Sequence, residues 1–359
     1  MDTHRGRATS PPPAIPWAAM PAPTRPPMAG VAIVLLAATL FGALGPLSRF
    51  AYEAGMEPLA FVAWRAGIGV LATGAFVAWR VTQRGERLTR LRDLDTRARL
   101  SLGIAAVMAF VLNLATFIAF GRITVALALL GFYTYPVLVA TVNVLLGREP
   151  LDRRRLIALF LAVLGMVAVV ASQLDPAAGV RLDVLGLALA LGGACCQAVF
   201  VILSRSGYRV VPADQAITVV LGVTVACSAA LAAVTGAVAT LTYPLGTTSL
   251  LAMLAFSGLF CAAIPSMLFL TGIRLVGGTG AGILMLFEPV VGVLLAAWLL
   301  GEGLAPIQLV GGLAILTAAL ILQRAAPPSD RIVAAPAVEG DAPSQDQGPS
   351  PLPLRGSEG

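Results

Sequence analysis

Two oppositely charged side chains lie inside long apolar stretches of the chain. Glu288 stands between Phe287 and Pro289, and Arg65 follows Trp64 in a second apolar run. An ionised side chain at membrane depth is costly unless it is paired, protonated or hydrated, so it normally faces the protein interior. We therefore predict that Arg65 and Glu288 border one cavity. There the arginine would attract a carboxylate, and the glutamate would attract an ammonium group or a proton.

Two structural alternatives remain for this pair. Arg65 and Glu288 could form a buried ion pair that fixes the register of two helices, or Arg65 could extend its long side chain to the nearer membrane surface. The predicted span of Arg65 enters from outside, which puts Arg65 ~12 Å below the outer boundary of the hydrocarbon layer. The predicted span of Glu288 enters from inside, which puts Glu288 ~14 Å above the inner boundary. In a hydrocarbon layer of ~30 Å, the two side chains are therefore at similar depths.

Composition identifies the class of protein that carries these residues. Of the 359 residues, 58% are hydrophobic and only 12% are charged, and the mean hydropathy is +0.89. These values exclude a water-exposed globular surface and indicate an integral membrane protein. A transmembrane barrel would alternate apolar and polar residues, whereas these runs are continuous and reach the ~20 residues of a spanning helix. We predict ten spans, at 29–51, 58–79, 100–121, 124–146, 155–172, 184–204, 215–239, 248–270, 279–300 and 305–323.

A repeated pattern of proline and glutamate indicates that the chain is duplicated. Glu149 follows Pro136 by 13 residues, and Glu302 follows Pro289 by the same interval, 153 residues later. The ten spans then divide into two halves of five. Because each half has an odd number of spans, the second half must insert upside down, which is an architecture of transporters. The predicted fold class is an all-α integral membrane protein made of two inverted five-helix repeats.

The repeated prolines and glutamates have separate expected roles. Pro136 and Pro289 lie about halfway along their spans, where proline removes a backbone hydrogen bond and kinks a helix. The freed carbonyl groups are tolerated beside a hydrated cavity, although a packing kink without ligand contact would also account for the prolines. Glu149 and Glu302 end their spans at opposite membrane faces. They are predicted either to gate the cavity by pairing with arginines or to cap helices at the water boundary.

Further polar side chains within the spans are candidates for lining the cavity. They are Asn113, Thr116, Tyr133, Tyr135 and Gln197. Each could hydrogen-bond a zwitterionic substrate, and each could equally join two helices. Tyr135 has the position in the first half that Glu288 has in the second half. The two halves are therefore expected to be chemically unequal.

The distribution of arginine predicts the orientation in the membrane. All 24 basic residues are arginine, and the formal net charge is +6. With both termini in the cytoplasm, the inner loops hold fourteen arginines and the outer loops hold only Arg49, Arg122 and Arg181, as the positive-inside rule requires. The arginines alternate between loops instead of covering a folded soluble domain, so no nucleic-acid partner is expected. We predict a multi-pass protein of the plasma membrane.

The residue inventory argues against several other functions. The single histidine, His4, lies in the proline-rich N-terminal segment, and lysine is absent, which leaves little chemistry for a membrane-embedded lipid-modifying enzyme. The four cysteines lack metal-ligand spacing and histidine partners, so no metal or other cofactor is expected. The sequence contains no selectivity-filter pattern, so a channel is not expected. Energy would come from an ion or substrate gradient. Glu288 is the obvious proton site, although an ionised pair with Arg65 would oppose that role.

The paired prolines, the glutamates that follow them and Arg65 together resemble the drug/metabolite transporter superfamily, specifically its ten-helix branch built from two EamA repeats. The resemblance covers roughly residues 29–323 and implies repeats at 29–172 and 183–323. The proline-rich segments 1–28 and 325–359 are predicted to be disordered tails. The resemblance implies a carrier in the lipid bilayer that exports an amino acid or a related small molecule by alternating access. Uptake or efflux of sugars, nucleosides or drug cations is the alternative.

Overall fold

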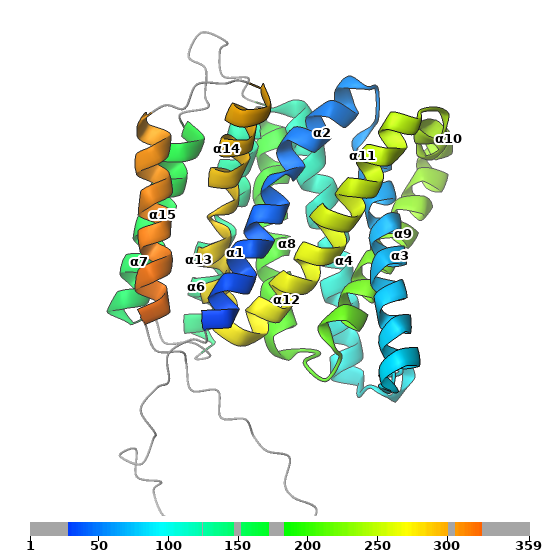
Figure 1. Ribbon diagram of the computed structural model, residues 1–359, viewed down its shortest axis with the longest axis horizontal. Helices are drawn as coiled ribbons and strands as arrows, with labels where there is room; N and C mark the ends of the chain where they lie inside the picture. The colour runs from blue at the N-terminus through cyan, green and yellow to red at the C-terminus, as the bar shows by residue number, and fades with distance from the viewer. Residues whose placement is uncertain (1–27, 124, 147–151, 172–182, 301–305, 325–359) are drawn as a thin grey trace, which may run out of the picture. The chain divides into compact units, whose positions relative to one another are not determined.

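The protein contains helices and no strand in the residues that the structure describes (Figure 1). This computed structural model describes residues 28–123, 125–146, 152–171, 183–300 and 306–324. The first half contains α1 (Met28–Gly42), α2 (Leu44–Glu53), α3 (Pro58–Arg84), η2 (Leu91–Asp93), α4 (Thr96–Arg122), α5 (Val125–Phe132), α6 (Tyr135–Leu145) and α7 (Arg153–Ala171). The second half contains α8 (Val184–Ser206), α9 (Ala213–Thr235), α10 (Val238–Thr242), η3 (Tyr243–Gly246), α11 (Thr248–Gly258), η4 (Leu259–Ala263), α12 (Ile264–Val276), α13 (Gly278–Met285), α14 (Glu288–Leu300) and α15 (Pro306–Arg324).

All ten predicted spans coincide with helical segments in this part of the chain. Length and apolar composition qualify six of the described segments to cross a membrane: α1 with α2, α3, α4, α8, α9, and α11 through α12. The other four predicted spans are α5 with α6, α7, α13 with α14, and α15. Proline interrupts two of these, and α7 and α15 have 19 residues each. A 19-residue helix rises about 28 Å, which is close to the thickness of the hydrocarbon layer.

The two predicted proline breaks occur at equivalent places in the two halves. α5 ends at Phe132 and α6 begins at Tyr135, while α13 ends at Met285 and α14 begins at Glu288. Three backbone hydrogen bonds recur with the same 153-residue offset. In the first half, the N–H of Thr134 donates to the Gly131 carbonyl, and the N–H groups of Val137 and Leu138 donate to the Thr134 carbonyl. In the second half, the N–H of Phe287 donates to the Leu284 carbonyl, and the N–H groups of Val290 and Val291 donate to the Phe287 carbonyl. This shared geometry supports the duplication.

Two further prolines interrupt spans that the hydropathy pattern presents as continuous. Pro46 follows the short break between α1 and α2. Pro265 follows η4, a π-helix within the span that the sequence predicts at 248–270. Because proline has no N–H, Pro265 cannot donate to the carbonyl of Cys261, four residues earlier. That carbonyl is left for a side chain of another helix, and π-helical turns are frequent at functional sites.

The two halves pack with an approximate two-fold relationship. α4 packs against α8, and α12 packs against α1 as the corresponding pair of the other half. α3 packs against α9, and α7 packs against α15 at one edge of the bundle (Figure 1). α1 and α8 run in opposite directions, and the start of α1 and the end of α15 lie at the same end of the bundle. This arrangement is that of two inverted five-helix repeats.

The bundle is closed more tightly at the end that holds the start of α1. Here α6 packs against α13, and the Asn143 side-chain nitrogen donates to the Thr279 hydroxyl oxygen at 3.4 Å. A side-chain carbon added at Gly282 would lie 3.3 Å from Pro136, so the two backbones approach closely. We call this the α6–α13 contact. The equivalent contact of the inverted repeat would be between α5 and α14, and these two helices have few or no close contacts among the described residues.

Candidate functional site

A cavity of about 300 Å³ lies between the two halves, beside the proline breaks. Its walls come from both repeats, but α7 and α15 contribute none of its lining within the described ranges. Several residues predicted from the sequence meet in it: Arg65, Asn113, Thr116, Tyr135, Gln197, Glu288 and Pro289. The structure places Arg65 and Glu288 at one cavity, and their part in binding a substrate stays a prediction.

Arg65 is buried in α3 and held by groups from both halves. Its Nη2 donates to the side-chain oxygen of Asn113 in α4, and its Nη1 donates to the Cys261 carbonyl at 3.5 Å. The Cys261 carbonyl is the group that Pro265 leaves without its helical donor. The guanidinium carbon lies 5.1 Å from the centre of the Phe117 ring, within the range of a cation–π contact. These contacts hold Arg65 at the cavity, so it does not extend to the membrane surface.

Glu288 is the first residue of α14, directly after the second predicted break. The positive end of the α14 dipole favours a carboxylate at this position. Glu288 interacts electrostatically with Arg65 across the cavity, but no ion pair joins their side chains among the ion pairs of the described residues. The guanidinium group of Arg65 and the carboxyl group of Glu288 therefore line one space without an ion pair between them.

Neutral polar groups add hydrogen-bonding capacity to the cavity. The buried hydroxyls of Thr116 and Tyr135 have no hydrogen-bond partner among the described residues, and Gln197 lies beside Tyr135. Ser266 also lines the cavity, although it was not among the residues predicted from the sequence. It follows Asn113 by 153 residues, so the repeat interval itself was the signal that could have identified it.

Aromatic rings form much of the remaining wall, and the sequence did not predict them. The lining phenylalanines are Phe41, Phe117, Phe120, Phe132, Phe200 and Phe269. An apolar, aromatic wall with a few placed polar groups is typical of small-molecule sites. Phenylalanine is ordinary in membrane helices, so the sequence pattern alone does not separate these rings from lipid-facing ones.

The remaining predicted residues lie beside the cavity or outside the described part of the chain. The Tyr133 ring is buried against Phe132, with ring centres 5.5 Å apart, and its hydroxyl lies near Glu288 without reaching hydrogen-bonding geometry. Pro136 kinks the backbone at the start of α6 but does not line the cavity. Glu149 and Glu302 lie outside the described residues.

Comparison with known families identifies the architecture. The sequence model of the EamA-like transporter family matches residues 28–171 and 184–324, one match for each five-helix half. The chain belongs to the EamA-like transporter family. This membership confirms the predicted resemblance to the drug/metabolite transporter superfamily and the prediction of a multi-pass membrane transporter.

Relatives of this EamA-like transporter agree with the assignment. A protein of Archaeoglobus fulgidus, described as an uncharacterized transporter, is 28% identical over 296 residues, which cover 82% of this chain and 96% of that protein. A solved structure described as "Crystal structure of protein" superposes with a TM-score of 0.66 at 18% identity, covering 83% of this chain and 98% of that chain. At that identity, the likeness is one of fold.

The EamA-like repeats also make clear how unequal the two halves of the cavity are. Tyr135 and Glu288 occupy equivalent positions after the two breaks, and both line the cavity. The first half contributes a neutral hydroxyl where the second contributes a carboxylate. A ligand therefore meets an asymmetric site inside a nearly symmetric fold.

Proposed function

We propose that this transporter is a secondary carrier that exports an amino acid or a related small zwitterionic metabolite across the plasma membrane. The observation that carries the proposal is that Arg65 and Glu288 border one cavity without forming an ion pair. A cation and an anion held apart at membrane depth can bind the carboxylate and the ammonium group of one zwitterion. The cavity volume of about 300 Å³ is at the small end for ligand sites, which suits a molecule of amino-acid size.

The contacts of each charged side chain suggest its role. One N–H of Nη2 of Arg65 donates to the Asn113 side chain, and one N–H of Nη1 donates to the Cys261 carbonyl. The buried Nε of Arg65 has no partner among the described residues. Its remaining N–H groups are available for a substrate carboxylate. Glu288 would accept hydrogen bonds from the ammonium group, and the hydroxyls of Thr116 and Tyr135 could bind either end of the molecule. The phenylalanine wall suits an apolar substrate side chain.

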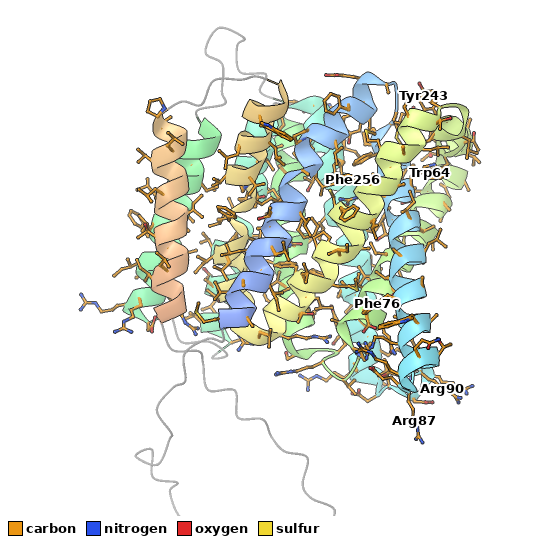
Figure 2. All side chains as sticks on the ribbon, in the orientation of Figure 1. Trp64, Phe76, Arg87, Arg90, Tyr243 and Phe256 are labelled. Carbon is orange, nitrogen blue, oxygen red and sulfur yellow. The ribbon has the colours of Figure 1, made fainter. Side chains whose placement is uncertain are left out.

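The uneven closure of the bundle suggests the state that the structure represents. Arg87 and Arg90 lie at the same end as the start of α1 (Figure 2), and the positive-inside rule assigns this end to the cytoplasm. The α6–α13 contact would then close the cytoplasmic side, whereas the lining extends toward Gly45 and Phe120 on the other side. Transport would require α6 and α13 to separate as α5 and α14 approach, the exchange expected of inverted repeats.

Glu288 also supports a proposal of proton coupling. It is a cavity-lining acid without an ion-pair partner among the described residues, so a proton and a substrate ammonium group would compete for it. Exchange of one for the other would allow protons that enter the cell to drive substrate out. An outside-acid pH gradient should therefore accelerate export, and collapse of the gradient with an ionophore should remove the acceleration.

Counterflow in proteoliposomes tests the substrate class. Vesicles preloaded with an unlabelled compound are diluted into trace amounts of the labelled compound, for a panel of amino acids, sugars, nucleosides and cationic drugs. We expect transient accumulation of one or a few amino acids. Accumulation restricted to the other three classes would contradict the amino-acid assignment while leaving a carrier. Chemical conversion of a compound in detergent, without accumulation in vesicles, would contradict the carrier assignment itself.

A further inference from the structure

The loop that joins α3 to α4 is held in a defined shape against α9. The Thr89 N–H donates to the Gln215 side-chain oxygen at 3.2 Å, and Arg99 donates to the Leu94 carbonyl at 2.8 Å. Leu94 is buried, and η2 forms a short helical turn just before it. These contacts anchor the loop to α9 and to the start of α4.

The arginines of this region differ in their ion pairing, and Arg92 lies 3.8 Å from Asp93. Arg80 is tied to Asp214 at 2.6 Å and also pairs with Glu86, so its charge is compensated. Arg84, Arg87 and Arg90 are exposed, and none forms an ion pair with a described residue. Figure 2 shows Arg87 and Arg90 at the end of α3, directed away from the bundle. The loop therefore presents guanidinium groups that have no ion-pair partner among the described residues.

Large apolar side chains are exposed beside these arginines. Leu88 and Leu91 each follow an exposed arginine and are 51% and 44% exposed. Trp79 is 45% exposed and stacks on Phe76, with ring centres 5.8 Å apart. The guanidinium carbon of Arg84 lies 4.9 Å from the centre of the Trp79 ring. Tryptophan and arginine in this combination are typical of the boundary between acyl chains and headgroups.

The length of α3 puts this region at the membrane boundary. Its 27 residues rise about 40 Å, which is ~10 Å longer than the hydrocarbon layer. The excess is accommodated by tilt or by extension into the headgroup region, and the segment from Trp79 to Arg84 is the charged end of the helix. Leucines at this level can enter the acyl region while the neighbouring guanidinium groups stay with the phosphates.

We propose that Trp79, Arg84, Arg87, Leu88, Arg90 and Leu91 form a binding surface for the headgroup of an anionic phospholipid. The guanidinium groups donate hydrogen bonds to the lipid phosphate, and the leucine and tryptophan side chains contact its acyl chains. The apolar half of this surface is the reason to assign it to a lipid and not to a free anion. This surface is separate from the cavity, and the inference does not depend on the transported substrate.

Quenching of Trp79 by brominated lipids tests the surface in the full-length chain. In a variant with Trp17, Trp64 and Trp298 replaced by Phe, Trp79 fluorescence is measured in bilayers that contain brominated phosphatidylglycerol or brominated phosphatidylcholine. We expect phosphatidylglycerol to bind preferentially. Replacing Arg87 and Arg90 by Gln should reduce the preference by about fivefold for each arginine removed. An excess of inorganic phosphate should leave the preference unchanged.

The matched control removes two exposed arginines elsewhere on the same face, as Arg153→Gln with Arg209→Gln. This variant should keep the lipid preference of Trp79. Equal affinity for the two lipids, an equal loss in the control, or displacement of phosphatidylglycerol by inorganic phosphate would each overturn the proposal. If the tryptophan substitutions prevent folding, native mass spectrometry of chains with all tryptophans makes the same comparison. Retained phosphatidylglycerol should then fall in the Arg87→Gln, Arg90→Gln variant and not in the control.

Discussion

The Asn113 side chain determines how Arg65 is presented to the cavity. It accepts a hydrogen bond from Nη2 of Arg65 and is itself held, since its nitrogen donates to the Ala109 carbonyl at 2.8 Å. Hydrogen bonds to charged groups contribute about 1.5–3 kcal/mol. Asn113 is therefore a positioning residue for the guanidinium that we propose to bind the substrate carboxylate.

Replacing Asn113 by Ala should weaken substrate binding more than turnover. Because Arg65 would lose its orienting partner, we expect the apparent KM for transport to rise about tenfold or more, the factor that a charged hydrogen bond represents. The maximal rate should change far less. Initial rates in proteoliposomes over a range of substrate concentrations measure both quantities. A lowered maximal rate with an unchanged KM would argue against a positioning role.

Glu288→Gln should abolish transport while the protein still folds. The amide keeps the size of the side chain but loses the charge that would bind an ammonium group or a proton, a loss of about 10- to 100-fold in affinity. Glu57→Gln is the matched control, because Glu57 is an exposed acid that precedes α3. Counterflow and size-exclusion profiles of the two variants are the measurements. Retained transport in Glu288→Gln would remove this residue from the mechanism.

The sequence led to the prediction of a cavity shared by Arg65 and Glu288, but it did not indicate which groups hold Arg65. Position along a span gives the depth of a residue in the membrane. It does not give the direction in which the residue faces, because that depends on helix rotation and packing. The contact between Arg65 and Asn113, which are 48 residues apart, depends on the direction in which both residues face. The phenylalanine lining escaped prediction for the same reason.

At the scale of helical elements, the breaks in the spans supply the polar backbone groups of the site. Pro136 and Pro289 could be predicted as breaks because the repeat singled them out. Pro265 occurs without a counterpart in the first half, where Leu112 stands 153 residues earlier, so the repeat gave no signal for it. Its effect is to free the Cys261 carbonyl for Arg65, which links α3 of the first half to η4 of the second.

Pro265→Ala should reduce transport by restoring a helical donor for the Cys261 carbonyl. Arg65 would then lose one of its two acceptors, and we expect an activity loss of about tenfold with normal expression. Pro58→Ala is the control, since Pro58 begins α3, where a missing N–H has no cost. Transport rates normalised to reconstituted protein make the comparison. Equal activity of Pro265→Ala and the native chain would show that the π-helix is not needed for the site.

At the scale of the whole molecule, the inverted repeat makes the two ends of the bundle nearly equivalent in sequence but not in conformation. The duplication and the span count predicted the architecture, because both follow from hydropathy and spacing. Which end is closed could not be predicted, since the two closed arrangements would be built from equivalent segments. In the structure, Asn143 and Thr279 contribute to closing one end through the α6–α13 contact.

Reciprocal cysteine reactivity tests whether the two ends of the bundle give alternating access to one cavity. In a full-length chain without its native cysteines, one variant carries Gly45→Cys, where a side chain meets no atom within 4 Å, and another carries Thr279→Cys at the α6–α13 contact. A membrane-impermeant maleimide is added to either side of proteoliposomes, with and without the transported compound. We expect the compound to lower labelling at residue 45 from one side and to raise labelling at residue 279 from the other. Simultaneous labelling of both positions, unaffected by the compound, would indicate a continuous pore and rule out alternating access.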